Sequence, residues 1–566
     1  MRARVNGQPR RVPMIAAGAA IAAALLAPLP AAAAVSRDDT PSGYTRYVRA
    51  RAADAAGRTE LAARGYAAVL AETPDDSVLA LRTYRQAIAA GDRPLATRTA
   101  RMLDARKLLP ADGRLLLLAD ALLAADWKAA TLATDRIEQE GVYGFAVPVL
   151  RGWIAQGSRK GDPFVALDAA RSGGPIAMAY AAEHRALIAL ATGRIDEGVA
   201  AVKALSTGGG GRAVRLQLAA ASALAKRGDR AGALAMIAGN DGTLTAARKI
   251  VTDGRPLPGG VDGPAEGIAA LLTRTAVDIN RERVTPVSLT LARLATFLAP
   301  GNAENWLVTS EILSAGEQYE SALAALEQVK PGDPFEEAAR FSRVQLLVRR
   351  GEPEKALGEA LAMARAGNTA DDWVRVGQVQ TELERHAEAA DSYGKALALA
   401  DKAGATGDRW ALLLQRGSAL DRSGNWPAAR FLLEEAVRIA PDQASALNYL
   451  GYAQLERRIN LPEAEKLIER ASRLRPDDAA ITDSLGWTYY LRGDVPKAIA
   501  TLEAAVSSEP AEPTINEHLG DAYWTIGRRL EARYAWRAAL VFAEAKDAPR
   551  IRSKIDTGWS PAVAAP

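Results

Sequence analysis

The sequence predicts an all-α protein built as a superhelical solenoid of paired helices. A glycine recurs in the last third of the chain, at Gly417, Gly451, Gly486 and Gly520, with intervals of 34, 35 and 34 residues. Prolines close three of these four repeats, and a proline ends a helix because it cannot donate the next backbone hydrogen bond. A period of about 34 residues is the length of one helix-turn-helix unit, which can bury its apolar face only against neighbouring units.

Small residues recur at matching positions in these units. A second glycine marks most of the turns between the two helices, and two alanines follow in each second helix. The alanines are Ala429, Ala464, Ala498 and Ala532, and then Ala436, Ala471, Ala505 and Ala539. Small side chains at these places predict close contact between helices, with larger residues such as Leu450 and Leu485 filling the space beside them. These are the signature positions of the tetratricopeptide repeat (TPR).

The strength of the repeat pattern predicts the order of domains. We expect a signal peptide over 1–34, a degenerate TPR-like solenoid over 36–238, a Gly/Pro-rich connection over 239–267, a C-terminal TPR solenoid over 268–545 and a tail over 546–566. The connection lacks an apolar period, so it would separate two stacked solenoid segments. The repeats are clearest over 410–544, and we expect residues 560–566 to lack a fixed structure.

The N-terminus has the parts of an export signal. Four arginines precede an apolar run over 12–29, and alanines follow over 31–34. This order predicts a signal peptide cleaved after Ala34, and hence a periplasmic protein. The alternative is an uncleaved segment that anchors the protein in the inner membrane. The interruptions at Pro28 and Pro30 favour cleavage.

Composition excludes several kinds of partner and site. Removing the four arginines of residues 1–34 from the 71 basic residues leaves 67, which equals the number of acidic residues. A neutral mature chain has no long-range field that attracts phosphates, so we expect no nucleic acid partner and only indirect contact with a membrane. The chain has no cysteine. Disulfides, thiolate metal sites and the acylated cysteine of a lipoprotein are therefore excluded.

Motifs of catalysis and metal binding are missing from the sequence. The three histidines, His184, His386 and His518, share no metal-ligand spacing such as HExxH, and no GxSxG motif occurs. The four glycines of 208–211 precede no Gly-Lys-Ser/Thr, so we read them as a loop and not as a phosphate site. We therefore expect no enzymatic activity, no cofactor, no metal and no small-molecule substrate.

Three stretches in the clearest repeats extend the likeness beyond the generic unit. They are Leu447-Asn448-Tyr449-Leu450-Gly451-Tyr452, Asp483-Ser484-Leu485-Gly486-Trp487 and His518-Leu519-Gly520-Asp521-Ala522-Tyr523-Trp524. These stretches resemble the C-terminal part of a family of proteobacterial envelope TPR proteins, which includes lipoprotein adaptors of a carboxyl-terminal processing protease. The resemblance implies an adaptor whose partner is a periplasmic protease or an assembly or secretion factor. The lipoprotein members are tethered through a cysteine that this chain lacks.

The first helix of each TPR unit lines the concave face, which predicts a binding groove. Its groove-facing positions are Asn448, Tyr452, Asp483, Trp487, Tyr490, Glu517, Asp521 and Trp524. Aromatic anchors between carboxylates fit a protein segment with basic and apolar side chains. We expect Asp483 and Asp521 to face the groove because charges are costly to bury. For Trp487 and Tyr452, packing between units is an equal alternative.

The sequence thus predicts a non-catalytic scaffold or adaptor of the bacterial cell envelope that binds a protein in this groove. The alternative is a structural component of an envelope secretion or assembly complex, tethered to the membrane by an uncleaved signal. Some TPR proteins grip a C-terminal carboxylate with Lys and Asn, and that pair is absent from the corresponding positions here.

Overall fold

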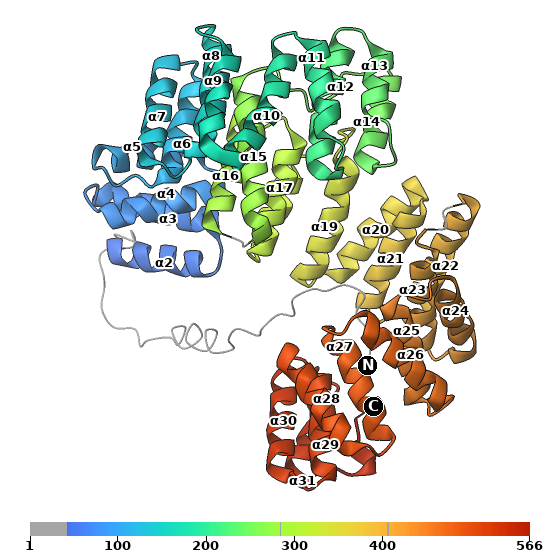
Figure 1. Ribbon diagram of the computed structural model, residues 1–566. Coiled ribbons are helices and arrows are strands. Elements are labelled where there is room, and N and C mark those ends of the chain that lie inside the picture. The colour runs from blue at the N-terminus through green and yellow to red at the C-terminus, as the bar shows by residue number, and fades with distance from the viewer. Residues whose placement is uncertain (1–41, 283–284, 405–406, 566) are drawn as a thin grey trace. The chain divides into compact units, whose positions relative to one another are not determined.

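The computed structural model describes residues 42–282, 285–404 and 407–565. It divides into an N-terminal unit, residues 36–352, and a C-terminal unit that begins at Pro353, and each unit consists of packed α-helices (Figure 1). The predicted signal peptide lies outside the described residues. Within the described residues, no helix has both the length and the apolar character needed to span a bilayer.

In the part of the N-terminal unit that the structure describes, there are eighteen α-helices. The first nine of its α-helices are α2 (Gly43–Ala55), α3 (Thr59–Glu72), α4 (Ser77–Ala90), α5 (Arg93–Ala105), α6 (Ala111–Leu123), α7 (Trp127–Glu140), α8 (Val147–Ser158), α9 (Pro163–Asp168) and α10 (Gly174–Ala191), with 3₁₀ turns η1 (Gly144–Ala146) and η2 (Ala169–Gly173). The others are α11 (Ile195–Leu205), α12 (Gly210–Lys226), α13 (Arg230–Met236), α14 (Gly242–Thr252), α15 (Pro264–Glu282), α16 (Pro286–Leu298), α17 (Ala303–Ala315), α18 (Tyr319–Leu326) and α19 (Glu336–Arg350).

Late helices of the N-terminal unit pack against early ones. Helix α16 contacts α4 and α6, and α15 contacts α6, α8 and α10. One continuous cluster of buried apolar residues runs from Ala50 to Ile312. Helices α15 and α16, which the sequence assigns partly to the connection and partly to the C-terminal solenoid, therefore form part of the core of the N-terminal unit.

The C-terminal unit is a series of helical pairs. Its helices are α20 (Pro353–Gly367), α21 (Ala370–Glu382), α22 (His386–Lys402), α23 (Arg409–Arg422), α24 (Trp426–Ile439), α25 (Ala444–Glu456), α26 (Leu461–Leu474), α27 (Ala479–Leu491), α28 (Val495–Ser508), α29 (Pro513–Thr525), α30 (Arg529–Phe542) and α31 (Ala548–Thr557), followed by the 3₁₀ turn η3 (Pro561–Val563). The closest pairings join α21 to α22, α23 to α24, α25 to α26, α27 to α28 and α29 to α30. This is the helix-turn-helix solenoid that the sequence predicted.

Local sequence explains where these helices begin and turn. The side chain of Asp478 accepts hydrogen bonds from the backbone N–H groups of Ala480 and Ile481, both at 3.1 Å, and so caps α27. In the turn between α27 and α28, Gly493 has φ +84°, in the left-handed region that favours glycine. The turn residues therefore fix the length of each pair.

The recurrent glycines mark close contacts between paired helices. A Cβ atom on Gly451 would lie 2.9 Å from the carbonyl oxygen of Ala464, and one on Gly486 would lie 2.7 Å from the side chain of Leu502. The recurrent alanines of the second helices are all buried. Small residues at these positions allow the helices to approach, as the sequence predicted.

Two segments differ from our expectations. Helix α14 and the start of α15 occupy part of 239–267, and the main division of the chain falls between Glu352 and Pro353 instead. The tail is ordered through residue 565: it contains α31, and η3 lies within 560–566, where we expected no fixed structure. Contacts with the preceding repeats hold this tail in place.

Candidate protein-binding groove

The eight predicted groove residues lie on three neighbouring helices. Asn448 and Tyr452 come from α25, and the remaining six are divided between α27 and α29. Helix α27 contacts both α25 and α29, so the three helices form one surface. The repeat therefore brings these residues onto three adjacent helices, and we call them the groove residues.

A segment of the same chain covers this surface. Residues 548–565, here called the C-terminal segment, comprise α31, Gly558 and the stretch around η3. Gly558 has φ +93°, and a Cβ atom there would overlap the ring of Trp524. A glycine is therefore needed where the chain leaves α31 and passes over α29.

Two basic side chains of α31 reach the carboxylates of α29. The Nζ of Lys554 donates to Glu517 Oε1 at 2.8 Å and to the two carboxylate oxygens of Asp521 at 2.7 and 2.8 Å. Arg550 donates to both oxygens of Glu517, at 2.9 and 2.8 Å. Lys554 and Asp521 have no exposed side-chain surface. This is a buried ionic cluster, in which each charge depends on its partner.

Asp521 accepts hydrogen bonds from four groups. Besides Lys554, its donors are the indole of Trp536 at 2.9 Å, the indole of Trp559 at 3.1 Å and the backbone N–H of Ala565 at 2.9 Å. Three of the four donors belong to the C-terminal segment. Our expectation that Asp521 faces an open groove is therefore wrong, because this segment supplies the donors that make its burial tolerable.

The cluster shifts the two carboxyl pKa values in opposite directions. Burial would raise the pKa of Glu517, but the hydrogen bonds from Arg550 and the charge of Lys554 outweigh it, and the pKa is lowered. Burial raises the pKa of Asp521, and Lys554 compensates only in part. Glu517 therefore holds its negative charge more firmly than Asp521.

Asp483 is buried against His518, which is not one of the predicted groove residues. His518 Nδ1 lies 2.9 Å from Asp483 Oδ1, and neither side chain is exposed. Our expectation of an open position for Asp483 is thus also wrong, because a hydrogen-bonded ring covers it. The ring of Trp487 stacks between His518, at a centroid distance of 4.0 Å, and Tyr490, at 4.6 Å.

The aromatic groove residues, which we call the aromatic floor, are Tyr452, Trp487, Tyr490 and Trp524. Tyr452 and Trp487 are buried in one apolar cluster that also contains Ala565 of the C-terminal segment. Asn448 is 3% exposed, and its side-chain oxygen has no hydrogen-bond partner among the described residues. The ring of Trp524 is half-buried beside Arg529, whose guanidinium carbon lies 4.4 Å from the ring centroid. Aromatic side chains thus pack between neighbouring repeats of the C-terminal unit and also contact the C-terminal segment.

The residues that fill the groove are not predicted by the repeat pattern. Arg550, Lys554 and Trp559 lie beyond the last clear repeat, where no period draws attention to them. One signal was present in the sequence: Glu517 and Asp521 are spaced four apart, and so are Arg550 and Lys554. Side chains spaced four apart share a helix face, so the acidic pair and the basic pair are complementary in charge and in spacing.

Comparison with known proteins identifies the repeats of this unit. The family model described as tetratricopeptide repeat matches residues 414–479, 456–514 and 484–549. The C-terminal unit contains tetratricopeptide repeats. Repeats of this family generally mediate protein–protein interaction. The three matches include every groove residue and end just before the C-terminal segment begins to contact them.

Solved structures of TPR proteins resemble parts of the chain. A TPR protein from Parabacteroides merdae matches with 16% identity over 45% of this chain and 97% of its own, with a TM-score of 0.37. TTC0263 from Thermus thermophilus matches with 23% identity over 33% of this chain and 98% of its own, with a TM-score of 0.29. MamA from Desulfovibrio magneticus matches with 19% identity, covering 31% and 94%, with a TM-score of 0.26. No curated protein matches the sequence.

Proposed function

We propose that this protein is a non-catalytic scaffold of the bacterial cell envelope that binds a partner protein along α25, α27 and α29. The C-terminal segment occupies this groove when no partner is bound, and a partner segment of similar chemistry displaces it. The proposal combines the TPR repeats, which are protein-binding modules, with the contents of the groove.

The observation that carries the proposal is the way the C-terminal segment docks. It presents two basic side chains, Arg550 and Lys554, to the carboxylates of α29, and then apolar groups to the aromatic floor. This is the chemistry that the groove residues predicted for a partner. An intramolecular segment with matching chemistry can act as a competitor for an external one, because its local concentration is high.

The geometry defines the partner segment. It needs two basic residues one helical turn apart, matching the spacing of Glu517 and Asp521, and an apolar or aromatic residue shortly after them. Charge-assisted hydrogen bonds to two buried carboxylates give such a segment a large energetic advantage over a neutral one. An acidic segment would meet like charges and is excluded.

The cellular setting of the proposal rests on the sequence. The arginine-rich start, the apolar run over 12–29 and the alanines before Val35 support export. The resemblance to envelope adaptors supports a periplasmic protease or an assembly or secretion factor as the partner. N-terminal sequencing of the protein purified from a periplasmic fraction tests this part, and a mature chain that begins after Ala34 is the expected result.

A peptide-binding experiment tests the groove. A labelled peptide of residues 548–565 is titrated into the chain that ends at Asp547, and fluorescence anisotropy reports binding. We expect saturable binding to the shortened chain, and at least about tenfold weaker binding to the full chain, whose own segment competes. Helical content measured by circular dichroism verifies that the shortened chain stays folded.

Two variants of the peptide provide the controls. Lys554→Glu in the peptide places a negative charge against Asp521 and should abolish binding, whereas Arg552→Glu alters an exposed side chain of the same helix and should retain it. A folded shortened chain that does not bind the parent peptide would show that the segment is a permanent cap of the solenoid. The groove would then not be a reversible binding site.

A further inference from the structure

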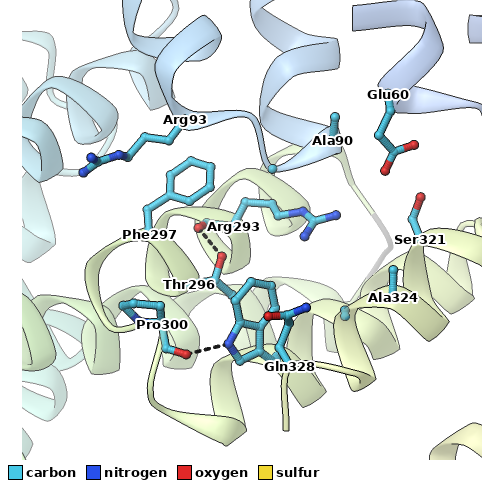
Figure 2. Close-up of a pocket in the computed structure, with 13 residues that line it drawn as sticks. Glu60, Ala90, Arg93, Arg293, Thr296, Phe297, Pro300, Ser321, Ala324 and Gln328 are labelled. Atoms are coloured by element: carbon cyan, nitrogen blue, oxygen red, sulfur yellow. Dashed lines mark hydrogen bonds between the residues drawn. The ribbon is translucent and has the colours of Figure 1, made fainter.

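The N-terminal unit contains a pocket that is separate from the groove. Its volume is about 430 Å³, and its walls come from α3, the turn between α4 and α5, and helices α16 to α18 (Figure 2). Pockets of this size hold small organic ligands, and they combine apolar walls with a few polar groups. The walls here include the apolar side chains of Phe297 and Trp306.

A buried arginine reaches this pocket from α16. Arg293 is 5% exposed, and its Nε and Nη2 donate to the carbonyl oxygen of Ala89 at 3.1 and 2.8 Å. Among the described residues, its Nη1 has no hydrogen-bond partner and no carboxylate forms an ion pair with it. Gly91 leaves the space that Nη1 occupies, since a Cβ atom there would lie 3.3 Å from it.

The buried charge of Arg293 is unusual within this unit. Arg215 is buried to a similar degree, but both oxygens of Glu304 accept hydrogen bonds from it, at 2.7 and 2.6 Å. Burial lowers the pKa of Arg293 to about 10, although the carboxylate of Glu60 acts in the opposite direction. A buried cation without an acidic partner is costly. The pocket therefore has an uncompensated charge that an anionic ligand would neutralise.

Polar groups near Arg293 define the charge of the ligand. Arg93 and Arg293 line the pocket together with one acidic residue, Glu60, so the lining residues have one excess positive charge. Figure 2 shows the side chain of Arg293 extending toward the side of the pocket where Glu60 and Ser321 lie. Ser321 is 7% exposed, and its hydroxyl has no hydrogen-bond partner among the described residues. One negative charge fits this setting, whereas a dianion would be repelled by Glu60.

The aromatic side chains define the body of the ligand. The indole N–H of Trp306 donates to the carbonyl oxygen of Pro300 at 2.8 Å, which fixes the orientation of its ring. Phe297 lines the pocket from the same helix as Arg293, one turn farther along. A flat apolar group can pack against these rings while a charged end reaches Arg293.

We propose that this pocket binds a monocarboxylate with a compact apolar or aromatic body. The carboxylate accepts hydrogen bonds from Nη1 of Arg293 and from the hydroxyl of Ser321, and the body packs against Phe297 and Trp306. The ligand is bound and not converted, in keeping with the absence of a catalytic motif. This site is independent of the groove, and its ligand is either a free organic acid or the carboxyl end of a peptide.

Calorimetric titration of the full chain with 3-phenylpropionate tests the proposal. We expect saturable binding of this probe, and at least about tenfold weaker binding of its neutral amide, because the amide cannot form a charge-assisted hydrogen bond. Phenyl phosphate, a dianion near neutral pH, should also bind more weakly. Equal binding of the acid and the amide, or no binding of the acid, would overturn the proposal.

Three variants locate the bound probe. Arg293→Gln should weaken binding of 3-phenylpropionate at least about tenfold, and Ser321→Ala about threefold or more. Arg340→Gln alters an exposed arginine of the same unit and should leave binding unchanged. Because Arg293 also joins α16 to α4, Ser321→Ala decides the result if the first variant does not fold. Unchanged binding in a folded Arg293→Gln variant would overturn the assignment. If Arg293→Gln does not fold, unchanged binding in Ser321→Ala would overturn it.

A final comparison identifies the source of the carboxylate. Acetyl-glycyl-phenylalanine and its C-terminal amide are titrated in the same way. Binding of the free acid at least as tight as that of 3-phenylpropionate indicates the carboxyl end of a peptide. If the dipeptide does not bind while 3-phenylpropionate does, the ligand is a small organic acid. Both results support the pocket as a carboxylate site.

Discussion

The Nζ of Lys554 lies 2.7 Å from Oδ1 of Asp521, and both side chains are completely buried. The two residues are 33 positions apart, one in the last helix and one in the first helix of the final repeat. Their contact joins the C-terminal segment to the predicted groove. The stability of the C-terminal unit and the availability of the groove therefore depend on the same ion pair.

Removing Lys554 should destabilise the C-terminal unit strongly. Lys554→Ala leaves the carboxylates of Glu517 and Asp521 buried with one cation fewer, and loss of one partner from a buried ion pair costs about 3–5 kcal/mol. The free energy of unfolding in urea measures the effect. Arg552→Ala, on an exposed position of the same helix, should change it by less than about 0.5 kcal/mol.

The double variant Lys554→Met with Asp521→Asn separates charge from packing. It removes both members of the pair and retains similar volume, so we expect it to recover most of the stability that Lys554→Ala loses. A double variant as unstable as the single one would show that the two residues act through shape and not through charge.

Adding one methyl group at a close contact should destabilise a repeat. In Gly451→Ala, the new Cβ meets the carbonyl oxygen of Ala464 at 2.9 Å, and a backbone atom cannot move aside as a flexible side chain can. We expect a loss of about 1–3 kcal/mol in the free energy of unfolding, measured by denaturation. Gly358→Ala is the matched control, since its Cβ would meet nothing within 4 Å in helix α20. That change should be neutral or stabilise by up to about 1 kcal/mol.

The contrast between these glycines shows what the sequence could predict. Recurrent Gly and Ala positions depend on contacts inside one repeat, so a local period predicts them, and the same period places the eight groove residues on three neighbouring helices. The contacts of α16 with α4 and α6 join residues far apart in the chain, and no local period encodes them. The burial of Asp521 likewise depends on Lys554, which lies outside the repeat.

The repeat pattern predicts only some properties of the groove. The aromatic and acidic character of its residues was evident from the sequence, and their burial was not, because burial depends on what covers them. Whether another protein takes the place of the C-terminal segment stays a prediction.

The N-terminal unit should lose stability in mildly acidic solution through His184. This side chain is fully buried, and its Nδ1 accepts a hydrogen bond from the indole of Trp153 at 3.0 Å, which requires the neutral ring. Burial lowers the pKa of His184 to about 4, and nearby Glu183 opposes this shift only in part. The unfolded chain binds a proton at this residue below about pH 6.5, whereas the folded chain does not.

The unfolded state therefore gains protons first as the pH falls, and the stability contributed by His184 is lost between about pH 6.5 and pH 4. From pH 7 to pH 5 the loss should be about 2 kcal/mol. Urea denaturation at the two pH values measures it. His184→Asn should be less stable at pH 7 and should show a smaller change with pH; an equal change in both proteins would assign the effect to another group.

Gly558 should control whether the C-terminal segment stays in the groove. Its φ of +93° is unfavourable for any residue with a Cβ atom, and the Cβ of an alanine would overlap the ring of Trp524. We expect Gly558→Ala to free residues 559–565, so that their backbone amides exchange hydrogen at least about tenfold faster, while α27 and α29 stay protected. Hydrogen exchange measured by mass spectrometry reports both regions in one experiment. Ser560→Ala, two residues farther along, should leave exchange unchanged. If Gly558→Ala instead increased exchange throughout α29 and α30, the C-terminal segment would be an integral part of the last repeat, and displacement by a partner would require the repeat itself to open.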